Sequence, residues 1–287
     1  MKIIREPAQM TAWANQASAA RAGVALVPTM GFFHEGHLAL MRRAKALADQ
    51  VVVSLFVNPI QFGPHEDLGR YPRDFARDCA LAEAQGVSVL FAPEAAAMYP
   101  EAAKTRIMVA GLSEGLCGAS RPGHFQGVAT VVAKLFNLVK PRVAVFGAKD
   151  FQQLAIIRRM VADLNWDIRI VAHPIVREAD GLAMSSRNTY LSAGERQKAL
   201  ALSQAIAHAR KRVREGLTAA DSLRDELREI ILRREGVEIE YISFVSEQDL
   251  SPLGRLAPGV VLAMAVKVGG TRLIDNDSLF AEPAALG

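Results

Sequence analysis

The stretch VALVPTMGFFHEGHLALMRRAKALA, residues 24–48, decides the fold. Its first four residues are apolar and predict a buried strand, and residues 36–48 have the length and pattern of a helix. A loop that contains glycine and histidine joins the two. A buried strand that leads through a short loop into a helix is typical of a βαβ unit, so this stretch predicts a parallel sheet.

The same alternation continues to residue 171. Further strands are predicted at residues 51–57, 87–91, 142–146 and 168–171, and helices at residues 74–85, 128–139 and 151–162. Beyond residue 176 the order changes to helices at 192–215 and 219–234, followed by strands at 238–245, 260–268 and 271–274. The Gly269-Gly270 pair predicts a hairpin turn. We therefore expect an α/β domain over residues 1–176 and a smaller C-terminal α+β domain over residues 177–287, with a shared cleft.

The composition is that of an ordinary globular protein. The 287 residues are 51% hydrophobic and 22% charged, enough apolar material for one large or two modest domains. No apolar run approaches the roughly 20 residues that span a bilayer. The first residues lack the apolar core of a signal peptide, so we expect a cytoplasmic protein.

Charge and cysteine usage exclude further classes of function. The net charge of +4 suits small anionic substrates. The basic cluster at residues 210–214 has no interleaved aromatic residues, so we expect no nucleic-acid partner. Cys79 and Cys117 form no CxxC pair, and we expect reduced thiols and neither a disulfide nor a metal site.

The residues that follow each predicted strand are the candidates for a site, because ligands of open parallel sheets bind beyond the carboxyl ends of the strands. His34 and His37 follow the first strand, at the start of a helix. Backbone N–H groups and the helix dipole favour phosphate there, and two imidazoles could hydrogen-bond a triphosphate. A pair with a structural role, or one that binds a metal, is equally compatible with this spacing.

Polar residues also follow the second and fourth strands. Asn58 and Gln61 are amides suited to hydroxyl or carboxylate groups, unless the turn only satisfies its own backbone. Lys149 could neutralise phosphate, and Asp150 could cap the next helix or bind ribose or a metal. An exposed lysine beside a capping aspartate is the alternative.

The loop at the junction of the two predicted domains carries two hydroxyls beside a guanidinium, Ser185, Ser186 and Arg187. This set suits phosphate oxygens, although an ordinary linker with a surface arginine is also compatible. The chain contains no GxxxxGK[ST] or GxGxxG motif, which disfavours the common phosphate-loop and dinucleotide folds. It also shows no Ser/His/Asp or Cys/His constellation for covalent catalysis. The four polar loops are expected to converge on one edge of the sheet.

Six motifs, taken together, resemble the pantothenate synthetase family. They are PTMGFFHEGH (28–37), VNPIQFG (57–63), DLGRYPR (67–73), RPGHFQGV (121–128), FGAKDFQQL (146–154) and READGLAMSSRN (177–188). Their order and spacing agree with that family over about residues 1–200, and the remainder fits in length. The resemblance implies a Rossmann-like domain of the nucleotidyltransferase type, followed by a small C-terminal domain.

The resemblance also implies an activity. It implies the ATP-dependent condensation of (R)-pantoate with β-alanine through a pantoyl adenylate, giving pantothenate, AMP and pyrophosphate. Magnesium would accompany ATP, no organic cofactor is implied, and a homodimer is expected. An alternative is a nucleotidyltransferase of the same fold that keeps the nucleotide on its product. A non-catalytic nucleotide-binding module is a third possibility, which the intact His34, His37, Lys149 and Arg187 disfavour.

Site residues are carried over by position. The implied ATP contacts are Met30, Gly31, Phe32, Phe33, His34, Glu35, Gly36, His37, Gly147, Ala148, Lys149, Asp150, Val176, Met184, Ser185, Ser186 and Arg187. Of these, His37 is the implied proton donor, and His34, Lys149 and Arg187 join it in catalysis. Gln61 and Gln153, with Asn58, are expected to bind pantoate or β-alanine, and Asp78 is the expected neighbour of magnesium. The chain departs from the family pattern at Ala148, where a glutamate is common, and at the bulky Phe32-Phe33 pair.

Overall fold

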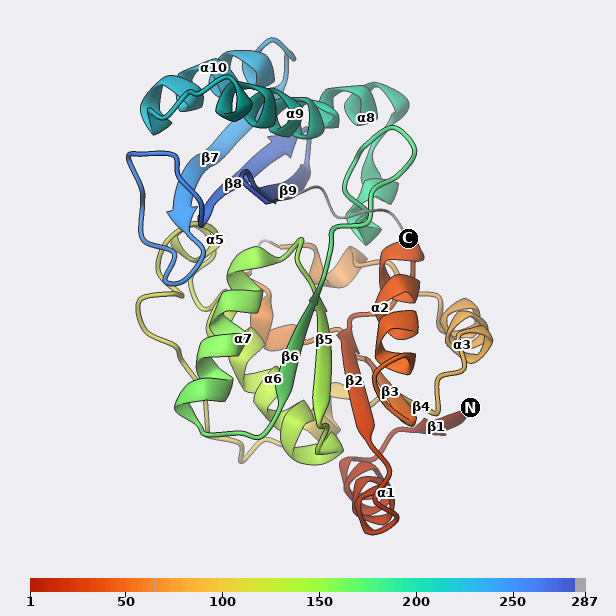
Figure 1. Ribbon diagram of the computed structural model, residues 1–287. Coiled ribbons are helices and arrows are strands. Elements are labelled where there is room, and N and C mark those ends of the chain that lie inside the picture. Colours follow the sequence, from red (N-terminus) through yellow and green to blue (C-terminus); the bar gives the residue numbers. More distant parts are fainter. Residues whose placement is uncertain (65, 282–287) are drawn as a thin grey trace.

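The computed structural model describes residues 1–64 and 66–281 and contains two sheets (Figure 1). The larger sheet has the strand order β1-β4-β3-β2-β5-β6, and every pairing in it is parallel. Its strands are β1 (Lys2–Ile4), β2 (Val24–Thr29), β3 (Gln50–Leu55), β4 (Val89–Phe91), β5 (Val143–Gly147) and β6 (Arg169–His173).

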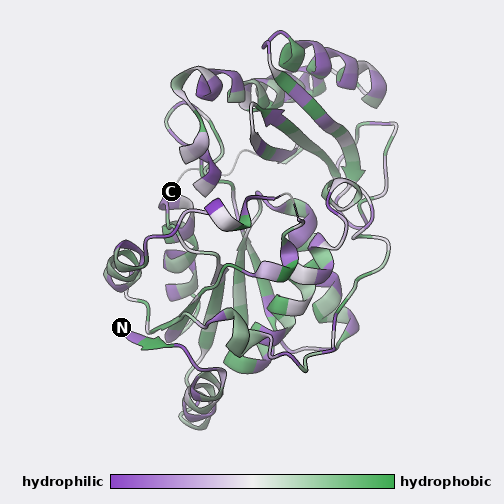
Figure 2. Ribbon diagram, turned by 180° about the vertical axis from the view of Figure 1, so that it is seen from behind, coloured by the Kyte–Doolittle hydropathy of each residue, from purple (hydrophilic) through white to green (hydrophobic). Residues whose placement is uncertain are grey.

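Helices cover both faces of this sheet. Alternate residues of each strand point to opposite faces, so Leu26 packs into one apolar cluster while Ala25 and Val27 pack into the other. The first cluster is completed by α1 (Pro7–Ala19), α6 (His124–Val139) and α7 (Phe151–Asp163), and the second by α2 (Glu35–Lys45) and α3 (Phe75–Ala84). Burial on both faces explains why the strands are continuous apolar runs, and Figure 2 shows hydrophobic strands beneath helices with hydrophilic outer sides.

The strand order creates one point at which the direction of winding reverses. From β2 the chain continues to β3 on one side, whereas β5 lies on the other side of β2. The loops that leave β2 and β5 therefore diverge and leave a crevice at the carboxyl ends of these strands. Such reversal points are where α/β sheets bind their ligands.

The C-terminal part is built on a separate antiparallel sheet of order β7-β8-β9. Its strands are β7 (Val237–Ser246), β8 (Val260–Val268) and β9 (Thr271–Ser278), and the helices beside it are α8 (Ala193–Ala199), α9 (Ala201–Arg214) and α10 (Ala220–Leu232). Leu227 of α10 and Leu262 of β8 are both fully buried in a core of this part alone. The predicted hairpin at Gly269 is confirmed, with a positive φ of 56° at that residue.

The remaining helices are short, and several lie beside the crevice. They are α4 (Ala95–Met98), α5 (Cys117–Ser120) and the 3-10 turns η1 (Pro59–Gln61), η2 (Asp67–Arg70) and η3 (Ser186–Tyr190). Among the described residues no helix has both the length and the apolar character needed to cross a bilayer.

The predicted α/β class and the separate C-terminal sheet are confirmed, with differences in detail. The structure adds β1 and α1, which the sequence did not predict. β1 has only three residues, and Met10 and Ala14 alone are buried in α1, so its apolar periodicity is weak. The helix predicted over residues 192–215 is two helices, interrupted at Leu200.

Candidate functional site

A cavity of about 240 Å³ lies at the carboxyl ends of the parallel strands and is bordered by all four predicted loops. The predicted residues around it are Met30, His34, Gly36, His37, Asn58, Gln61, Gly147, Lys149, Asp150, Gln153, Val176, Met184, Ser185, Ser186 and Arg187. A larger cavity of about 750 Å³ extends from it toward β7–β9 and shares Lys149, Gln153 and Arg187. The expected convergence of the loops on one sheet edge is therefore observed.

The two histidines stack at the start of α2. Their ring centroids are 4.1 Å apart, and Nδ1 of His37 accepts a hydrogen bond of 3.3 Å from the backbone N–H of His34. Burial, reinforced by the Lys149 charge, lowers the pKa of His34 to about 4. Burial and the neighbouring His34 lower the pKa of His37 well below its ordinary value. Both rings are therefore neutral at pH 7, and the neutral His37 carries its proton on Nε2 as a hydrogen-bond donor.

Gly36 allows the histidine rings to lie this close to the helix. A Cβ atom at Gly36 would be 2.9 Å from Nδ1 and Cε1 of His34 and 3.7 Å from the Cβ atom of Met184. The first of these distances is shorter than a carbon contact permits, whereas the second is an ordinary contact. The start of α2 and the loop at Met184 thus pack against each other through a glycine.

Asp78 of α3 holds the loop between β2 and α2 in place through hydrogen bonds. The Asp78 carboxylate is buried, and its two oxygens accept hydrogen bonds of 2.7 Å from the backbone N–H groups of Phe32 and Phe33. Burial raises the pKa of Asp78 in spite of these bonds. The carboxylate fixes Phe32 in a left-handed conformation, φ 51°, that a bulky residue rarely adopts.

This anchoring bears on the magnesium contact expected for Asp78, because its carboxylate oxygens already have amide partners. Magnesium in proteins usually takes carboxylate oxygens and several waters. Within residues 1–64 and 66–281, no three His, Cys, Asp or Glu side chains gather into a metal-binding group. The contact of magnesium with Asp78 stays a prediction, and the two amide bonds to its carboxylate do not support it.

Four of the residues expected to contact ATP have side chains that do not line the smaller cavity. Phe33 is fully buried in the core, Phe32 lines a different depression behind the loop, and Glu35 pairs with Arg42 at the surface. Ala148 contributes its carbonyl to β9 and does not line the cavity. Contacts from these four residues to a nucleotide would have to come from the backbone, because their side chains are engaged or directed away.

Gln61 is positioned by a buried neighbour. Asn58 is 1% exposed, and its amide donates to Oε1 of Gln61 at 3.0 Å and to the Gly127 carbonyl at 3.1 Å. Its own oxygen accepts from the Tyr99 hydroxyl at 2.9 Å. Asn58, expected to bind substrate, therefore has internal partners for its polar atoms and acts on the site by orienting Gln61. Among the described residues, the Gln61 side-chain nitrogen has one hydrogen-bond acceptor, the weakly accepting Sδ of Met30 at 3.1 Å.

Gln153 lines both cavities and has no hydrogen-bond partner in the part of the chain that is described. Its neighbour Gln152 is buried and fully engaged. The Gln152 oxygen accepts from the backbone N–H of Cys117, and its nitrogen donates to the carbonyls of Leu112 and Gly115. The free amide is thus the one that faces the cavity.

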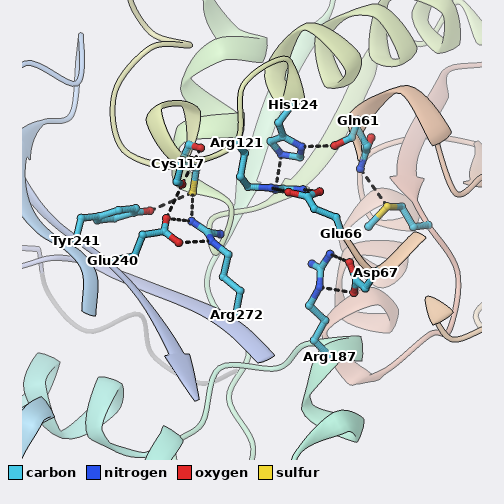
Figure 3. Close-up of polar contacts among 12 residues, drawn as sticks. Gln61, Glu66, Asp67, Cys117, Arg121, His124, Arg187, Glu240, Tyr241 and Arg272 are labelled. Carbon is cyan, nitrogen blue, oxygen red and sulfur yellow. Dashed lines mark hydrogen bonds and ion pairs between the residues drawn. The ribbon is translucent and has the colours of Figure 1, made fainter. Parts of the chain in front are cut away.

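Arg187 is held by an acid that the sequence did not single out. It donates two hydrogen bonds, of 2.8 and 2.9 Å, to the carboxylate of Asp67 in η2 (Figure 3). Its guanidinium also lies over the ring of Tyr71. Burial disfavours the charged carboxylate, but the bonds and charge of Arg187 lower the pKa of Asp67. By contrast, Lys149 has no ion-pair partner within the described residues.

A second arginine makes a parallel contact beside the first. Arg121 donates to both oxygens of Glu66, at 2.6 and 2.7 Å, and to Nε2 of His124 at 2.9 Å. Nδ1 of His124 in turn donates to the Gln61 carbonyl at 2.8 Å, so its tautomer is fixed (Figure 3). Burial and the Arg121 charge lower the pKa of His124 to about 4. These residues lie in quoted motifs, DLGRYPR and RPGHFQGV or beside them, but no strand end pointed to them.

The cysteines lie outside the smaller cavity, and both are free thiols. Buried Cys117 lies 3.1 Å from the Tyr241 hydroxyl and 3.2 Å from a nitrogen of Arg272, which also pairs with Glu240 (Figure 3). This cluster joins α5 to the small sheet at the far end of the larger cavity. The expectation of unpaired thiols is confirmed for these residues.

Comparison with known proteins places these observations in a family. Residues 2–278 match the family model described as pantoate-beta-alanine ligase. A protein of Heliobacterium modesticaldum named pantothenate synthetase is 54% identical over 96% of this chain and 98% of its own length. One of Geobacter sulfurreducens with the same name is 52% identical over 96% of this chain and 98% of its own length.

Solved structures agree with the fold. Pantothenate synthetase from Thermus thermophilus superimposes with a TM-score of 0.92 at 45% identity, covering 98% of this chain and 100% of that chain. A pantoate-beta-alanine ligase from Francisella tularensis, in a complex with an ATP compound and β-alanine, has a TM-score of 0.79 at 30% identity, covering 99% of this chain and 100% of that one.

Proposed function

The chain belongs to the pantoate-beta-alanine ligase family, and from that premise we propose that it joins (R)-pantoate to β-alanine in an ATP-dependent reaction. The products would be pantothenate, AMP and pyrophosphate. The observation that carries the proposal is that donors suited to phosphate, His37 and Lys149, share one cavity with two amides suited to a hydroxy acid, Gln61 and Gln153. A nucleotide and a small acid could thus meet there.

We propose that the reaction has two steps. First, a carboxylate oxygen of pantoate attacks the α-phosphorus of ATP, the bond to the β-phosphate oxygen breaks, and pyrophosphate leaves with the electron pair. Second, the neutral amine of β-alanine attacks the acyl carbon, AMP leaves, and the nitrogen loses a proton to give the amide. Adenylation is needed because a free carboxylate has no good leaving group.

Charge stabilisation of the first step is assigned to the start of α2 and the loop after β5. The backbone N–H groups at the helix start and the Nε2–H of His37 would donate to the phosphates, which is the role proposed for His37. His34 holds the His37 ring through its backbone N–H. Lys149 adds a full positive charge. Ser185, Ser186 and Arg187 complete the nucleotide site from the junction loop, at the border of the same cavity.

Substrate positioning is assigned to the amides. Gln61 and Gln153 would orient the hydroxyl and carboxylate groups of pantoate, with Gln61 also near β-alanine. Holding the reacting atoms in line accounts for a large part of the acceleration in such a reaction. Magnesium would enter bound to the phosphates of ATP, and no step is assigned to it.

The direct test incubates the protein with ATP, Mg²⁺, (R)-pantoate and β-alanine and measures products by mass spectrometry. The proposal requires pantothenate, AMP and pyrophosphate in equal amounts, and none of them when pantoate is omitted. A nucleotide retained on the final product would instead identify a nucleotidyltransferase of the same fold, and ATP binding without any product would identify a non-catalytic module.

A further inference from the structure

Strand β9 of the small sheet contacts the loop that carries Lys149. Asn276 is 8% exposed, and its side-chain nitrogen donates to two consecutive carbonyls, Ala148 at 3.0 Å and Lys149 at 2.8 Å. A primary amide has two N–H donors on one atom, so it can bind two neighbouring carbonyls at once. The N–H of Ala148 bonds in turn to the His173 carbonyl at 2.8 Å. The backbone that presents Lys149 is therefore fixed from two sides.

The preceding residue of β9 holds a second segment of the cavity wall. Asp275 is 2% exposed and accepts two hydrogen bonds from Arg177, at 2.6 and 2.9 Å. Arg177 directly follows Val176, and its guanidinium also donates to the Gly181 carbonyl at 3.1 Å. A bidentate pair with a buried carboxylate fixes orientation as well as distance. Asp275 further accepts from the backbone N–H of Asn276 at 2.9 Å, which links the two contacts.

Two adjacent side chains of the small sheet, Asp275 and Asn276, thus bind two segments of the parallel-sheet domain that border the cavity. One segment presents Lys149, and the other contains Val176, whose carbonyl accepts from the N–H of Met184 at 2.9 Å. A shift of β9 would therefore move both the segment that presents Lys149 and the segment that contains Val176. Neither Asp275 nor Asn276 needs to touch the nucleotide for this.

We propose that Asp275 and Asn276 are positioning residues for ATP: Asn276 orients Lys149, and Asp275 orients Val176 through Arg177. The inference rests on the proposed function, because it assumes that this cavity binds ATP. It assigns to β9 a part in nucleotide binding that the sequence did not predict. The small sheet then has a direct part in building the site.

The chain offers a matched control on the same strand. Asp277, two residues further along, pairs with Arg210 of α9 at 2.8 Å and is also largely buried, but it borders neither cavity. Asp277→Asn weakens this ion pair and removes a negative charge near Arg177 without removing a hydrogen bond to it, so it controls for the loss of charge in Asp275→Asn. Asn276→Asp keeps the shape of the side chain but places oxygens opposite two carbonyls, and Asp275→Asn weakens the bond to Arg177.

The measurement is ATP affinity by titration calorimetry, combined with the KM values for ATP and β-alanine. Loss of two hydrogen bonds in Asn276→Asp should weaken ATP binding about tenfold or more, and Asp275→Asn should weaken it severalfold. The KM for β-alanine should change less than about twofold. Asp277→Asn should lower the melting temperature but leave ATP affinity near that of the wild type.

ATP affinity within twofold of the Asp277→Asn value in both test variants would overturn the inference. If Asn276→Asp does not fold, Asn276→Ser, which retains one donor, is compared with Asp277→Asn by the same criterion. Calorimetry does not require turnover. A wild type that binds ATP but makes no pantothenate would therefore refute the proposed reaction while the role of β9 was still decided by the titration.

Discussion

Gln152 and Gln153 are neighbours on α7 with opposite surroundings. The amide of Gln152 makes three hydrogen bonds to the backbone of residues 112–117, whereas the amide of Gln153 faces the cavity. Of these two identical side chains, that of Gln152 serves folding, and that of Gln153 is available for binding. The strand pattern places both after β5 and does not distinguish them, because the distinction depends on which face of the helix meets the core; only the family resemblance singled out Gln153.

We predict that Gln153→Ala raises the KM for pantoate about tenfold or more and changes the KM for ATP much less, because it leaves substrate polar groups unpaired. Gln152→Ala should instead lower the free energy of unfolding by about 2 kcal/mol or more, since it orphans buried backbone groups. Steady-state kinetics and urea unfolding of both variants check this. Equal kinetic effects of the two substitutions would contradict the assignment.

Three partly buried histidines predict a stability that depends on pH. Burial lowers the pKa of His34 and His124 to about 4, and that of His37 well below its ordinary value. Below about pH 6.5 the unfolded chain binds protons at these residues while the folded chain does not, so stability falls as the pH drops from 6.5 toward 4. Above pH 6.5 the contribution is fully present.

His124→Gln should therefore lose less stability than the wild type between pH 7 and pH 5, by on the order of 1–2 kcal/mol. Urea unfolding at the two pH values measures the difference. Parallel pH profiles for wild type and His124→Gln would show that His124 is not held neutral in the fold.

At the scale of elements, helix α6 and the turn η1 touch through a glycine. A Cβ atom at Gly127 would be 2.4 Å from the Ile60 carbonyl and 2.7 Å from backbone atoms of Gln61. Backbone atoms cannot move aside as a flexible side chain can. This close approach lets Asn58 bond to the Gly127 carbonyl and so fixes the amide that faces the substrate.

Gly127→Ala should thus displace η1, lower the melting temperature by several degrees and raise the KM for pantoate. Gly194 in α8 is the control, because a Cβ atom there would meet nothing within 4 Å. Gly194→Ala should leave activity unchanged and stabilise the helix slightly. A fully active Gly127→Ala variant with wild-type melting would refute the role of this contact.

The long, apolar elements of the parallel sheet could be predicted from the sequence, because burial on both faces leaves an unambiguous pattern. Short elements could not: β1, α5 and η2 have too few residues for a period to be visible. The site followed the same rule. Residues directly after strands, such as His37 and Lys149, were found, whereas Asp67, Arg121 and Asn276 were not, because only tertiary packing brings them to the cavity.

At the scale of the whole molecule, the junction loop and η2 form a latch across the cavity. Arg187 pairs with Asp67, and Ser186 donates to the Phe32 carbonyl at 3.3 Å. Phosphate oxygens of ATP would compete with Asp67 for the same guanidinium. We propose that the two domains, divided near residue 176, close over ATP and that this loop becomes more ordered as they do.

Hydrogen exchange over residues 180–190 tests the closure. In the wild type, ATP should increase protection of this segment. Asp67→Asn should decrease its protection without ATP, because one partner of the latch is weakened, and added ATP should restore it. Unchanged protection in all four states would mean that the segment is a static linker.

The homodimer expected from the family resemblance stays a prediction, which sedimentation can decide independently.

The central claim is that pantoate is activated by adenylation before the amine is needed, in the cavity where His37 and Lys149 meet Gln61 and Gln153. The most direct measurement is the exchange of labelled pyrophosphate into ATP without β-alanine. The account predicts exchange that requires pantoate and falls about 10²-fold or more in His37→Ala and Lys149→Ala, the usual effect of losing a transition-state stabiliser, while exposed Lys104→Ala exchanges normally. Exchange that strictly requires β-alanine would contradict it.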